Sequence, residues 1–199
     1  MIYALPGMGA DRNMYPGVWQ TLTDCKFVEW PTYNGEDSIA AIAKRITTEQ
    51  KIRAGDVLIG SSLGGIVACE MAKITQVGSL VLVGGAKKKE EISGFLSMIH
   101  PLVDLMPLSF IQRLAGKIPS DIAQMFSKGQ AEFIRAMCRA IFDWDGLGDV
   151  PVRLLRIHGN KDRVIPLPEG VQHILDGGHL IAMTHSQECV DIIRANHAA

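Results

Sequence analysis

The sequence lacks three features that would each indicate a particular class of protein. It has no stretch of about 18 consecutive apolar residues, so no membrane span is predicted. The formal net charge is −1, with no basic stripe or acidic tail, and we therefore expect neither nucleic acid nor an anionic membrane surface as a partner. The first seven residues include no basic region and too short an apolar run for a signal peptide.

Cysteine is scarce, and its spacing forms no metal-binding or redox motif. The four cysteines are widely scattered without a CxxC pair: Cys25, Cys69, Cys138 and Cys189. We interpret them as small buried apolar residues in a reducing cytoplasm, and we expect neither a metal nor an organic cofactor. With 199 residues, 47% of them hydrophobic, the chain is long enough for one domain with a substantial core.

Short apolar runs alternate with helical patterns along the chain. The predicted strands are Ile2–Leu5, Phe27–Trp30, Val57–Ile59, Ser79–Val83, Val152–Ile157 and Val171–Leu175. Three helices are predicted. The first has Asp37 or Ser38 as its cap and apolar residues at helical spacing: Ile39, Ile42, Ala43 and Ile46. The second runs from after Ser62 to about Thr75, and the third from about Leu180 to Asn196. This alternation predicts an α/β fold with a mostly parallel, doubly wound sheet of about six strands, whose ligands bind at the carboxyl ends of the strands.

Residues 86–150 interrupt the alternation. They give no strand signal, but they include short helical patterns rich in Phe and Met, at Ser109–Ala115, Ser120–Phe126 and Glu132–Phe142. One interpretation is a helical subdomain that packs a small core of its own. We favour a helical lid, inserted into a single domain of residues 1–199, whose inner face forms an apolar substrate pocket.

A G-x-S-x-G pattern, Gly60-Ser61-Ser62-Leu63-Gly64, lies between a predicted strand and a predicted helix. This context is typical of a nucleophile elbow, in which the strand turns so sharply into the helix that the serine backbone is strained. Side chains two residues before or after the serine would collide across the turn, so glycine is expected at both places. The alternative is an ordinary Gly-Ser loop that closes a strand.

A serine nucleophile needs a base within hydrogen-bond reach, and the base needs an acid that fixes its tautomer. Asp162 follows a predicted strand at its carboxyl end, and His179 occupies the turn before the last helix. The order Ser, Asp, His fits an elbow serine served by later strand ends. The other candidates fit less well: His158 is close enough to Asp162 in sequence to brace that loop, His185 falls inside a predicted helix, and the remaining ones are His100, His173, His197, Asp143, Asp145 and Asp149.

With the segments LPGMGADRN, GSSLGG, HGNKDRVIP and GGHLIAMTH, the chain resembles the serine α/β-hydrolase superfamily over nearly its whole length. The resemblance implies that Ser62 is the nucleophile, His179 the general base and acid, and Asp162 its acid partner. It also implies that the backbone N–H groups of Met8 and Leu63 form the oxyanion hole.

Three departures from the superfamily pattern stand out. Pro6-Gly7 replaces the frequent His-Gly after the first strand, and the usual amino-terminal hairpin is missing. Asp162 and His179 are only 17 positions apart, so Leu167–Gly170 stands where relatives carry a helix. We therefore expect a trimmed version of the fold, with room for a self-association surface and hence a homo-oligomer.

The implied reaction is hydrolysis of an ester or thioester with a small or medium apolar acyl group, through an acyl-enzyme intermediate. A serine at position 62 argues against the dehalogenase and epoxide-hydrolase branches, which use a carboxylate nucleophile. Two alternatives stay open. The same triad can serve carbon–carbon bond hydrolysis, lyase chemistry or acyl transfer, and the scaffold can be a non-catalytic ligand receptor.

Overall fold

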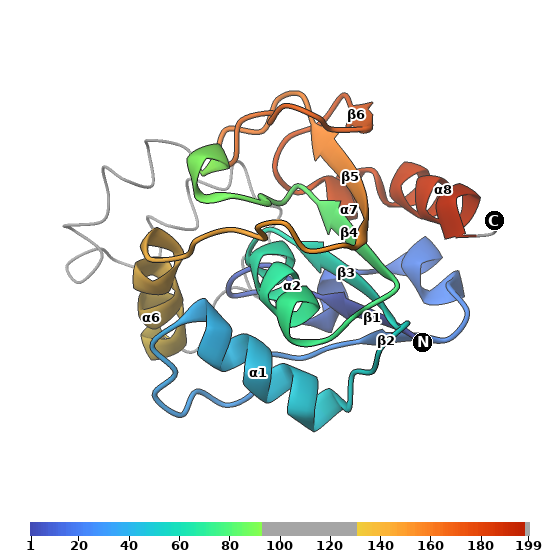
Figure 1. The fold of residues 1–199 in the computed structure, drawn as a ribbon. Coiled ribbons are helices and arrows are strands. Elements are labelled where there is room, and N and C mark those ends of the chain that lie inside the picture. The colour runs from blue at the N-terminus through green and yellow to red at the C-terminus, as the bar shows by residue number, and fades with distance from the viewer. Residues whose placement is uncertain (93–130, 198–199) are drawn as a thin grey trace.

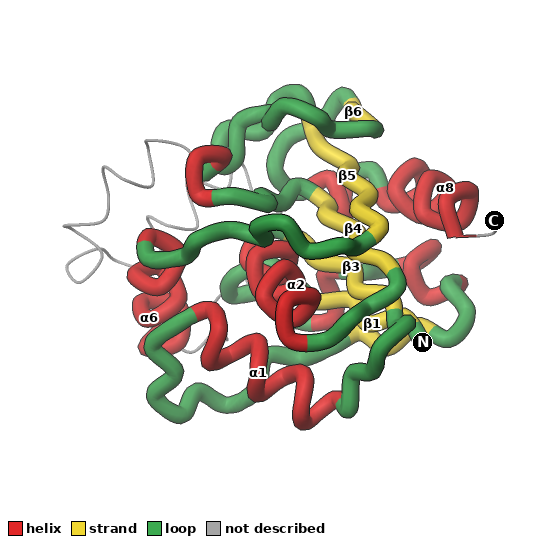
Figure 2. Tube along the Cα trace, viewed as in Figure 1, coloured by secondary structure: helices red, strands yellow, loops and turns green. Residues whose placement is uncertain are grey.

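The computed structural model describes residues 1–92 and 131–197, which build one parallel β-sheet with helices on both faces (Figures 1 and 2). The sheet has six strands in the order β2-β1-β3-β4-β5-β6, and every neighbouring pair is parallel. The strands are β1 (Ile2–Leu5), β2 (Cys25–Phe27), β3 (Val57–Ser61), β4 (Ser79–Val83), β5 (Arg153–Gly159) and β6 (His173–Leu175). The expected doubly wound α/β fold is confirmed.

Helices cover both faces of this sheet. They are α1 (Ile39–Gln50), α2 (Leu63–Ile74), α6 (Ala131–Phe142), α7 (Ile181–Thr184) and α8 (Ser186–His197), with 3-10 turns η1 (Arg12–Met14), η2 (Gly17–Thr21) and η3 (Lys89–Glu91). The helices α1, α2 and α6 share one core with the sheet, whereas η1, η2, α7 and α8 share the other (Figure 1). Among residues 1–92 and 131–197, no helix is both long and apolar enough to cross a bilayer.

The strand order reverses beside β1. The chain passes from β1 outward to β2, returns across β1 to β3, and then continues in the opposite direction to β6. At such a reversal the loops after the two central strands leave toward opposite faces, which opens a crevice at the carboxyl edge of the sheet. The turn after Leu5 and the loop after Ser61 both lie at this edge.

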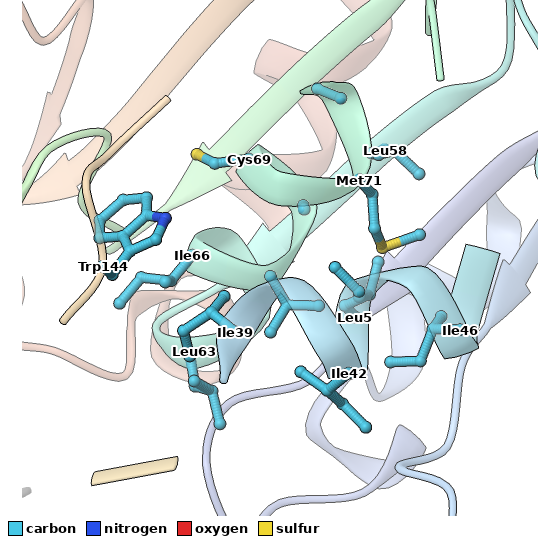
Figure 3. Packing of buried hydrophobic residues seen from close by; sticks show 14 of the residues in the cluster. Leu5, Ile39, Ile42, Ile46, Leu58, Leu63, Ile66, Cys69, Met71 and Trp144 are labelled. Carbon is cyan, nitrogen blue, oxygen red and sulfur yellow. The ribbon is translucent and has the colours of Figure 1, made fainter. Parts of the chain in front are cut away.

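Alternate residues of the central strands pack into two separate cores. Leu58, Leu80 and Leu82 pack with α1 and α2, as Figure 3 shows for Leu58 among the side chains of both helices. Ile59 and Val81 point to the opposite face and pack with α7 and α8. Because β4 is buried along its whole length, its four consecutive apolar residues are what a parallel strand covered on both faces requires.

Helix α1 follows the predicted pattern. Of the two candidate caps it is Ser38 that closes the amino terminus, since its Oγ accepts a hydrogen bond from the Ala41 N–H at 3.2 Å. The four apolar residues at helical spacing are all buried against α2: Ile39, Ile42, Ala43 and Ile46.

The predicted second strand, Phe27–Trp30, is wrong in its bounds. The strand β2 begins two residues earlier and ends at Phe27, although the Val28 N–H still donates to the Ala4 carbonyl at 2.8 Å. This is an edge strand with half-exposed residues at Cys25 and Phe27, so its first part carries little apolar signal. Trp30 lies beyond the end of β2, and its indole N–H donates to the Gly7 carbonyl in the turn after β1.

The single helix expected from Leu180 to Asn196 is interrupted. The helix α7 ends at Thr184, and α8 begins at Ser186, with His185 between them at φ −128° and ψ 41°. The Thr184 hydroxyl lies 2.8 Å from His185 Nδ1, and the His185 ring packs so closely on Gly177 that a Cβ there would lie 2.6 Å from its Cε1. His185 is therefore a packing residue at the break between α7 and α8, and not a residue inside one helix as the periodicity predicts.

Other bounds differ by one or two residues from the predictions. The strand β3 extends to Ser61, β5 spans Arg153–Gly159 and β6 starts at His173, while β4 has the predicted bounds. In the 86–150 segment, the pattern at Glu132–Phe142 is confirmed as α6. The patterns at Ser109–Ala115 and Ser120–Phe126, like His100, lie outside the described residues.

Candidate active site

Ser62 occupies a strained turn between β3 and α2. Its backbone has φ 52° and ψ −120°, a conformation that side-chain-bearing residues rarely adopt and that persists only where the surroundings enforce it. A Cβ on Gly60 would overlap the backbone of Gly64 and Gly65 across the turn. A Cβ on Gly64 would overlap the carbonyl oxygens of Leu5 and Pro6, so this glycine lets the start of α2 approach the end of β1.

The structure brings Ser62, His179 and Asp162 together in one hydrogen-bonded chain. His179 Nε2 lies 2.9 Å from Ser62 Oγ, and His179 Nδ1 lies 2.8 Å from Asp162 Oδ2. The Asp162 carboxylate can only accept a hydrogen bond, so His179 Nδ1 carries the proton and donates it. His179 Nε2 is then unprotonated and can accept the serine proton. Ser62 is half-buried, whereas His179 and Asp162 are buried.

The Asp162 carboxylate is saturated with hydrogen-bond donors. Its Oδ1 accepts the backbone N–H groups of Val164 and Ile165 at 2.8 and 2.9 Å, while its Oδ2 faces both His179 and His158. Burial would raise the pKa of this carboxyl, but the hydrogen bonds from His158 and His179, the nearby histidine charge and the Ile165 N–H lower its pKa well below the ordinary value. Asp162 is therefore a permanent anion that orients the imidazole.

His158, near the end of β5, braces the loop that carries Asp162. Its Nε2 lies 2.8 Å from the Ile165 carbonyl oxygen and 3.2 Å from Asp162 Oδ2. Both neighbours are acceptors, so Nε2 carries a hydrogen and donates to them. His158 thus braces the Asp162 loop, as its nearness to Asp162 in the sequence predicts, and it is not a second base for Ser62.

Close backbone contacts hold the His179 loop against the end of β5. The Lys161 N–H donates to the Gly177 carbonyl at 2.9 Å, and the Asn160 N–H donates to the Leu175 carbonyl at 2.9 Å. A Cβ on Gly159 would overlap the Gly177 carbonyl, so only glycine fits at the end of this strand. The loops after β5 and β6 therefore form one unit that carries both Asp162 and His179.

The turn after β1 lies directly beside the serine. A Cβ on Gly7 would be 3.6 Å from Ser62 Cβ, and the Ala10 N–H closes the turn on the Gly7 carbonyl at 3.2 Å. Gly9 has φ 71°, as the third position of a type II turn requires. Leu63 is the first residue of α2, so its N–H has no intrahelical acceptor. The two amides expected to form an oxyanion hole, those of Met8 and Leu63, thus belong to segments that flank Ser62.

Apolar side chains from α6 border the same turn. The Met8 sulfur lies 3.5 Å from the Cys138 sulfur, and Ile134 packs with both. Trp30 contacts Phe133 with ring centroids 5.2 Å apart. The sequence pattern of α6 predicted a helix, but it gave no signal that Met8 and Trp30 are its neighbours.

The other candidate residues lie away from this group. His173 belongs to β6, Asp149 precedes β5 at its amino end, and Asp143 and Asp145 follow α6 on the surface. Within the part of the chain that the structure describes, no cluster of three or more His, Cys, Asp or Glu side chains could hold a metal ion.

Comparisons with solved structures show which fold this is. An esterase from Exiguobacterium antarcticum superimposes with a TM-score of 0.77 at 17% identity, covering 100% of this chain and 91% of that one. A thermophilic esterase from Thermogutta terrifontis gives a TM-score of 0.72 at 17% identity, covering 98% and 88%. A bromoperoxidase from Bacillus anthracis gives 0.69 at 12% identity, covering 96% and 90%. At these identities the likeness concerns the fold.

One family profile covers almost the entire chain. A comparison with curated proteins finds no match. The profile of the alpha/beta hydrolase family matches residues 1–192, which include every strand of the sheet and the elbow, acid and histidine positions. The chain therefore belongs to the alpha/beta hydrolase family.

Proposed function

We propose that this protein is a serine hydrolase that cleaves an ester or thioester with a small or medium apolar acyl group. The observation that carries the proposal is the hydrogen-bonded chain from Ser62 Oγ to His179 Nε2 at 2.9 Å and from His179 Nδ1 to Asp162 Oδ2 at 2.8 Å. A nucleophile, a base of the correct tautomer and a buried anion are the parts that acyl transfer to serine requires.

In the first half-reaction, Ser62 Oγ attacks the acyl carbon while its proton moves to His179 Nε2. The imidazolium that forms is stabilised by Asp162, whose carboxylate stays ionised because its pKa is lowered. The carbonyl oxygen becomes an oxyanion, which the Met8 and Leu63 N–H groups receive. Each such donor contributes about 10²–10³ in rate. His179 then protonates the departing alcohol or thiol, leaving the acyl group on Ser62.

In the second half-reaction, water takes the place of the leaving group. His179 Nε2 accepts a proton from this water, which attacks the acyl carbon and again forms an oxyanion in the same hole. Collapse of the intermediate returns the proton to Ser62 Oγ and releases the carboxylic acid. The same groups thus serve both halves of the reaction, with no cofactor in any step.

The apolar acyl preference rests on the side chains near the turn after β1. Met8, Phe133, Ile134 and Cys138 are apolar, and they lie beside the turn that flanks Ser62. Two of the similar structures are named esterases, which supports ester cleavage as the reaction. We also propose that α6 belongs to the lid expected at 86–150. The four free cysteines support a cytoplasmic location, where thiols stay reduced.

A labelling experiment tests the role of Ser62. An active-site-directed fluorophosphonate should label the wild type and fail to label Ser62→Ala, and kcat for a short aryl ester should fall about 10⁴–10⁶-fold in this variant. Ser61→Ala is the matched control, because Ser61 Oγ is buried and has no hydrogen-bond partner within the described residues. This control should keep both labelling and turnover.

An acyl-length panel on the wild type tests the substrate class. Aryl esters from acetyl to dodecanoyl should show highest kcat/KM at short or medium length, with lower values for the longest chains. Transfer of the acyl group to an added alcohol or thiol in preference to water would favour acyl transfer instead. A wild type that neither labels nor cleaves any of these esters would favour a ligand receptor.

A further inference from the structure

The Gly7–Met8 peptide in the turn after β1 is held from outside the turn. Its carbonyl oxygen accepts a hydrogen bond from the Trp30 indole N–H at 3.0 Å and a second one from the Ala10 N–H at 3.2 Å. The peptide is trans, since the described chain has no cis peptide bond, and a trans peptide is close to planar. Its C=O and N–H therefore point in opposite directions, so a group that fixes the Gly7 oxygen also fixes the direction of the Met8 N–H.

The sheet order determines where these two directions lead. The strands β2 and β3 flank β1 on opposite sides, and Trp30 follows β2 whereas Ser62 follows β3. A Gly7 carbonyl directed toward Trp30 thus leaves the Met8 N–H directed toward the Ser62 side. In the part of the chain that the structure describes, the Met8 N–H donates to no backbone carbonyl. Met8 is the second residue of the β-turn, and the hydrogen bond of that turn uses the Ala10 N–H and not the Met8 N–H.

We propose that Trp30 is a positioning residue of the oxyanion hole, and that its indole N–H holds the Gly7–Met8 peptide so that the Met8 N–H meets the oxyanion. This inference rests on the proposed ester hydrolysis. Trp30 touches neither substrate nor oxyanion, and it acts only through the orientation of one peptide.

The turn needs this external contact because its own backbone is permissive. Rotation of the Gly7–Met8 peptide changes ψ of Gly7 together with φ of Met8. Gly7 has no side chain to restrict its ψ, and the Met14 sulfur, which accepts the Gly7 N–H at 3.2 Å, holds the preceding peptide and not this one. Pro6 before it has no N–H and no polar side-chain atom that could anchor the turn. The only hydrogen bond that the turn supplies to the Gly7 oxygen, from Ala10, is the longer of the two.

The indole is itself fixed by α6. Its ring lies against Phe133 with centroids 5.2 Å apart and planes at 45°, and Tyr33 also contacts Phe133 with centroids 6.3 Å apart. Trp30 is half-buried between α6 and the turn. A residue needed only to fill this space would not require an N–H, since phenylalanine fills most of the same volume. Packing alone therefore does not account for the indole N–H of Trp30 or for its direction toward the Gly7 oxygen.

The test separates the N–H from the ring. In Trp30→Phe the aromatic contact with Phe133 is kept and the donor is lost. A second variant replaces Trp30 by β-(3-benzothienyl)alanine, which keeps the bicyclic shape and has sulfur in place of N–H, so packing is preserved if the phenylalanine variant folds poorly. Trp144→Phe is the matched control, because Trp144 also donates a buried indole N–H, to Glu70 at 2.8 Å, far from the turn in sequence.

The readouts are kcat and KM for a short aryl ester and the Ki of an aryl trifluoromethyl ketone. Ser62 adds to this ketone, His179 takes the serine proton, and the resulting oxyanion occupies the hole. Both Trp30 variants should lower kcat about tenfold, below the 10²–10³ for complete loss of one donor, and should weaken ketone binding by the same factor. KM and the shape of the pH profile should stay unchanged, since His179 and Asp162 are untouched.

The outcomes distinguish this inference from the proposed function. An active wild type whose Trp30 variants lose no more kcat and ketone affinity than Trp144→Phe would overturn the positioning role. A rise in KM without a change in kcat would do the same, because it would show a role in binding or packing. A wild type that cleaves no ester would overturn the proposed function first, and this inference with it.

Discussion

Replacing Asp162 by asparagine is the sharpest perturbation of the proton relay. The side chain is fully buried, and its two oxygens face four donors: two backbone N–H groups on Oδ1, and the two histidines on Oδ2. An asparagine can satisfy the backbone pair only with its carbonyl oxygen. Its NH₂ group then faces His179 Nδ1 and forces that nitrogen to become an acceptor, so the proton moves to Nε2, where it blocks acceptance from Ser62.

The size of the effect follows from the hydrogen bonds that change. The asparagine variant loses one charge-assisted bond to His179, worth about 1.5–3 kcal/mol, and keeping the productive tautomer would leave two donors facing each other at a further cost of about 1–3 kcal/mol. The sum is about 2.5–6 kcal/mol, which corresponds to about 10²–10⁴ in rate. We therefore expect kcat for a short aryl ester to fall within this range.

The assay compares kcat/KM of wild type, Asp162→Asn and Asp176→Asn on the same ester. Asp176 belongs to the same pair of loops, but its side chain is 72% exposed and pairs with Lys161 at 2.7 Å on the surface, so its exchange should alter kcat/KM less than twofold. A loss of less than tenfold in Asp162→Asn would refute the tautomer argument. Equal losses in both aspartate variants would show that only the loop fold had been disturbed.

Two further predictions concern stability. Because the pKa of Asp162 is lowered in the fold, its contribution to stability is present above its unfolded pKa of about 3.9 and is lost as the pH falls from there toward the folded value. The free energy of unfolding in urea should therefore fall more steeply from about pH 5 to about pH 2 for wild type than for Asp162→Asn, and equal slopes would contradict this. Arg156 and Glu91 form a buried ion pair with two hydrogen bonds, at 3.0 and 2.7 Å. Arg156→Met leaves the Glu91 carboxylate buried without its partner, so it should lower the free energy of unfolding by about 3–5 kcal/mol. Adding Glu91→Leu removes that carboxylate and should restore most of the lost stability. A loss below about 1 kcal/mol in the single variant would show that Glu91 finds another partner or water.

The sequence predicted those parts of the fold in which local pattern and burial agree. The bounds of β4 follow from its uninterrupted apolar run, and α1 follows from a cap and four apolar residues on one face. The elbow could be recognised because its strain demands glycine at fixed distances from Ser62. In each case the determining contacts are close in the chain, or are shared by every strand buried on both faces.

What the sequence could not predict depends on contacts between distant segments. The sharp turn alone predicts glycine at position 64, but the nearest neighbours of Gly64 are the carbonyls at the end of β1. Trp30 is apolar and follows an apolar run, which predicts a strand residue. Its position is instead determined by the Gly7 carbonyl, 23 residues earlier, and by the Phe133 ring on α6. The break at His185 likewise reflects packing on Gly177, which helical periodicity cannot show.

The proton relay and the proposed oxyanion hole are held by different parts of this fold. Asp162 and His179 lie on loops after β5 and β6 that are joined by backbone hydrogen bonds, whereas Met8 is held by the turn after β1, Trp30 and α6. Ser62 stands between them: its Oγ lies 2.9 Å from His179 Nε2, and Leu63, whose N–H is the second proposed donor of the oxyanion hole, follows it as the first residue of α2. A substitution at Trp30 can therefore change stabilisation of the oxyanion while proton transfer keeps its geometry, and one at Asp162 can do the reverse. This separation is why the two kinds of variant should differ in pH profile even where they lower kcat alike: the profile should keep its shape in the Trp30 variants and change in Asp162→Asn.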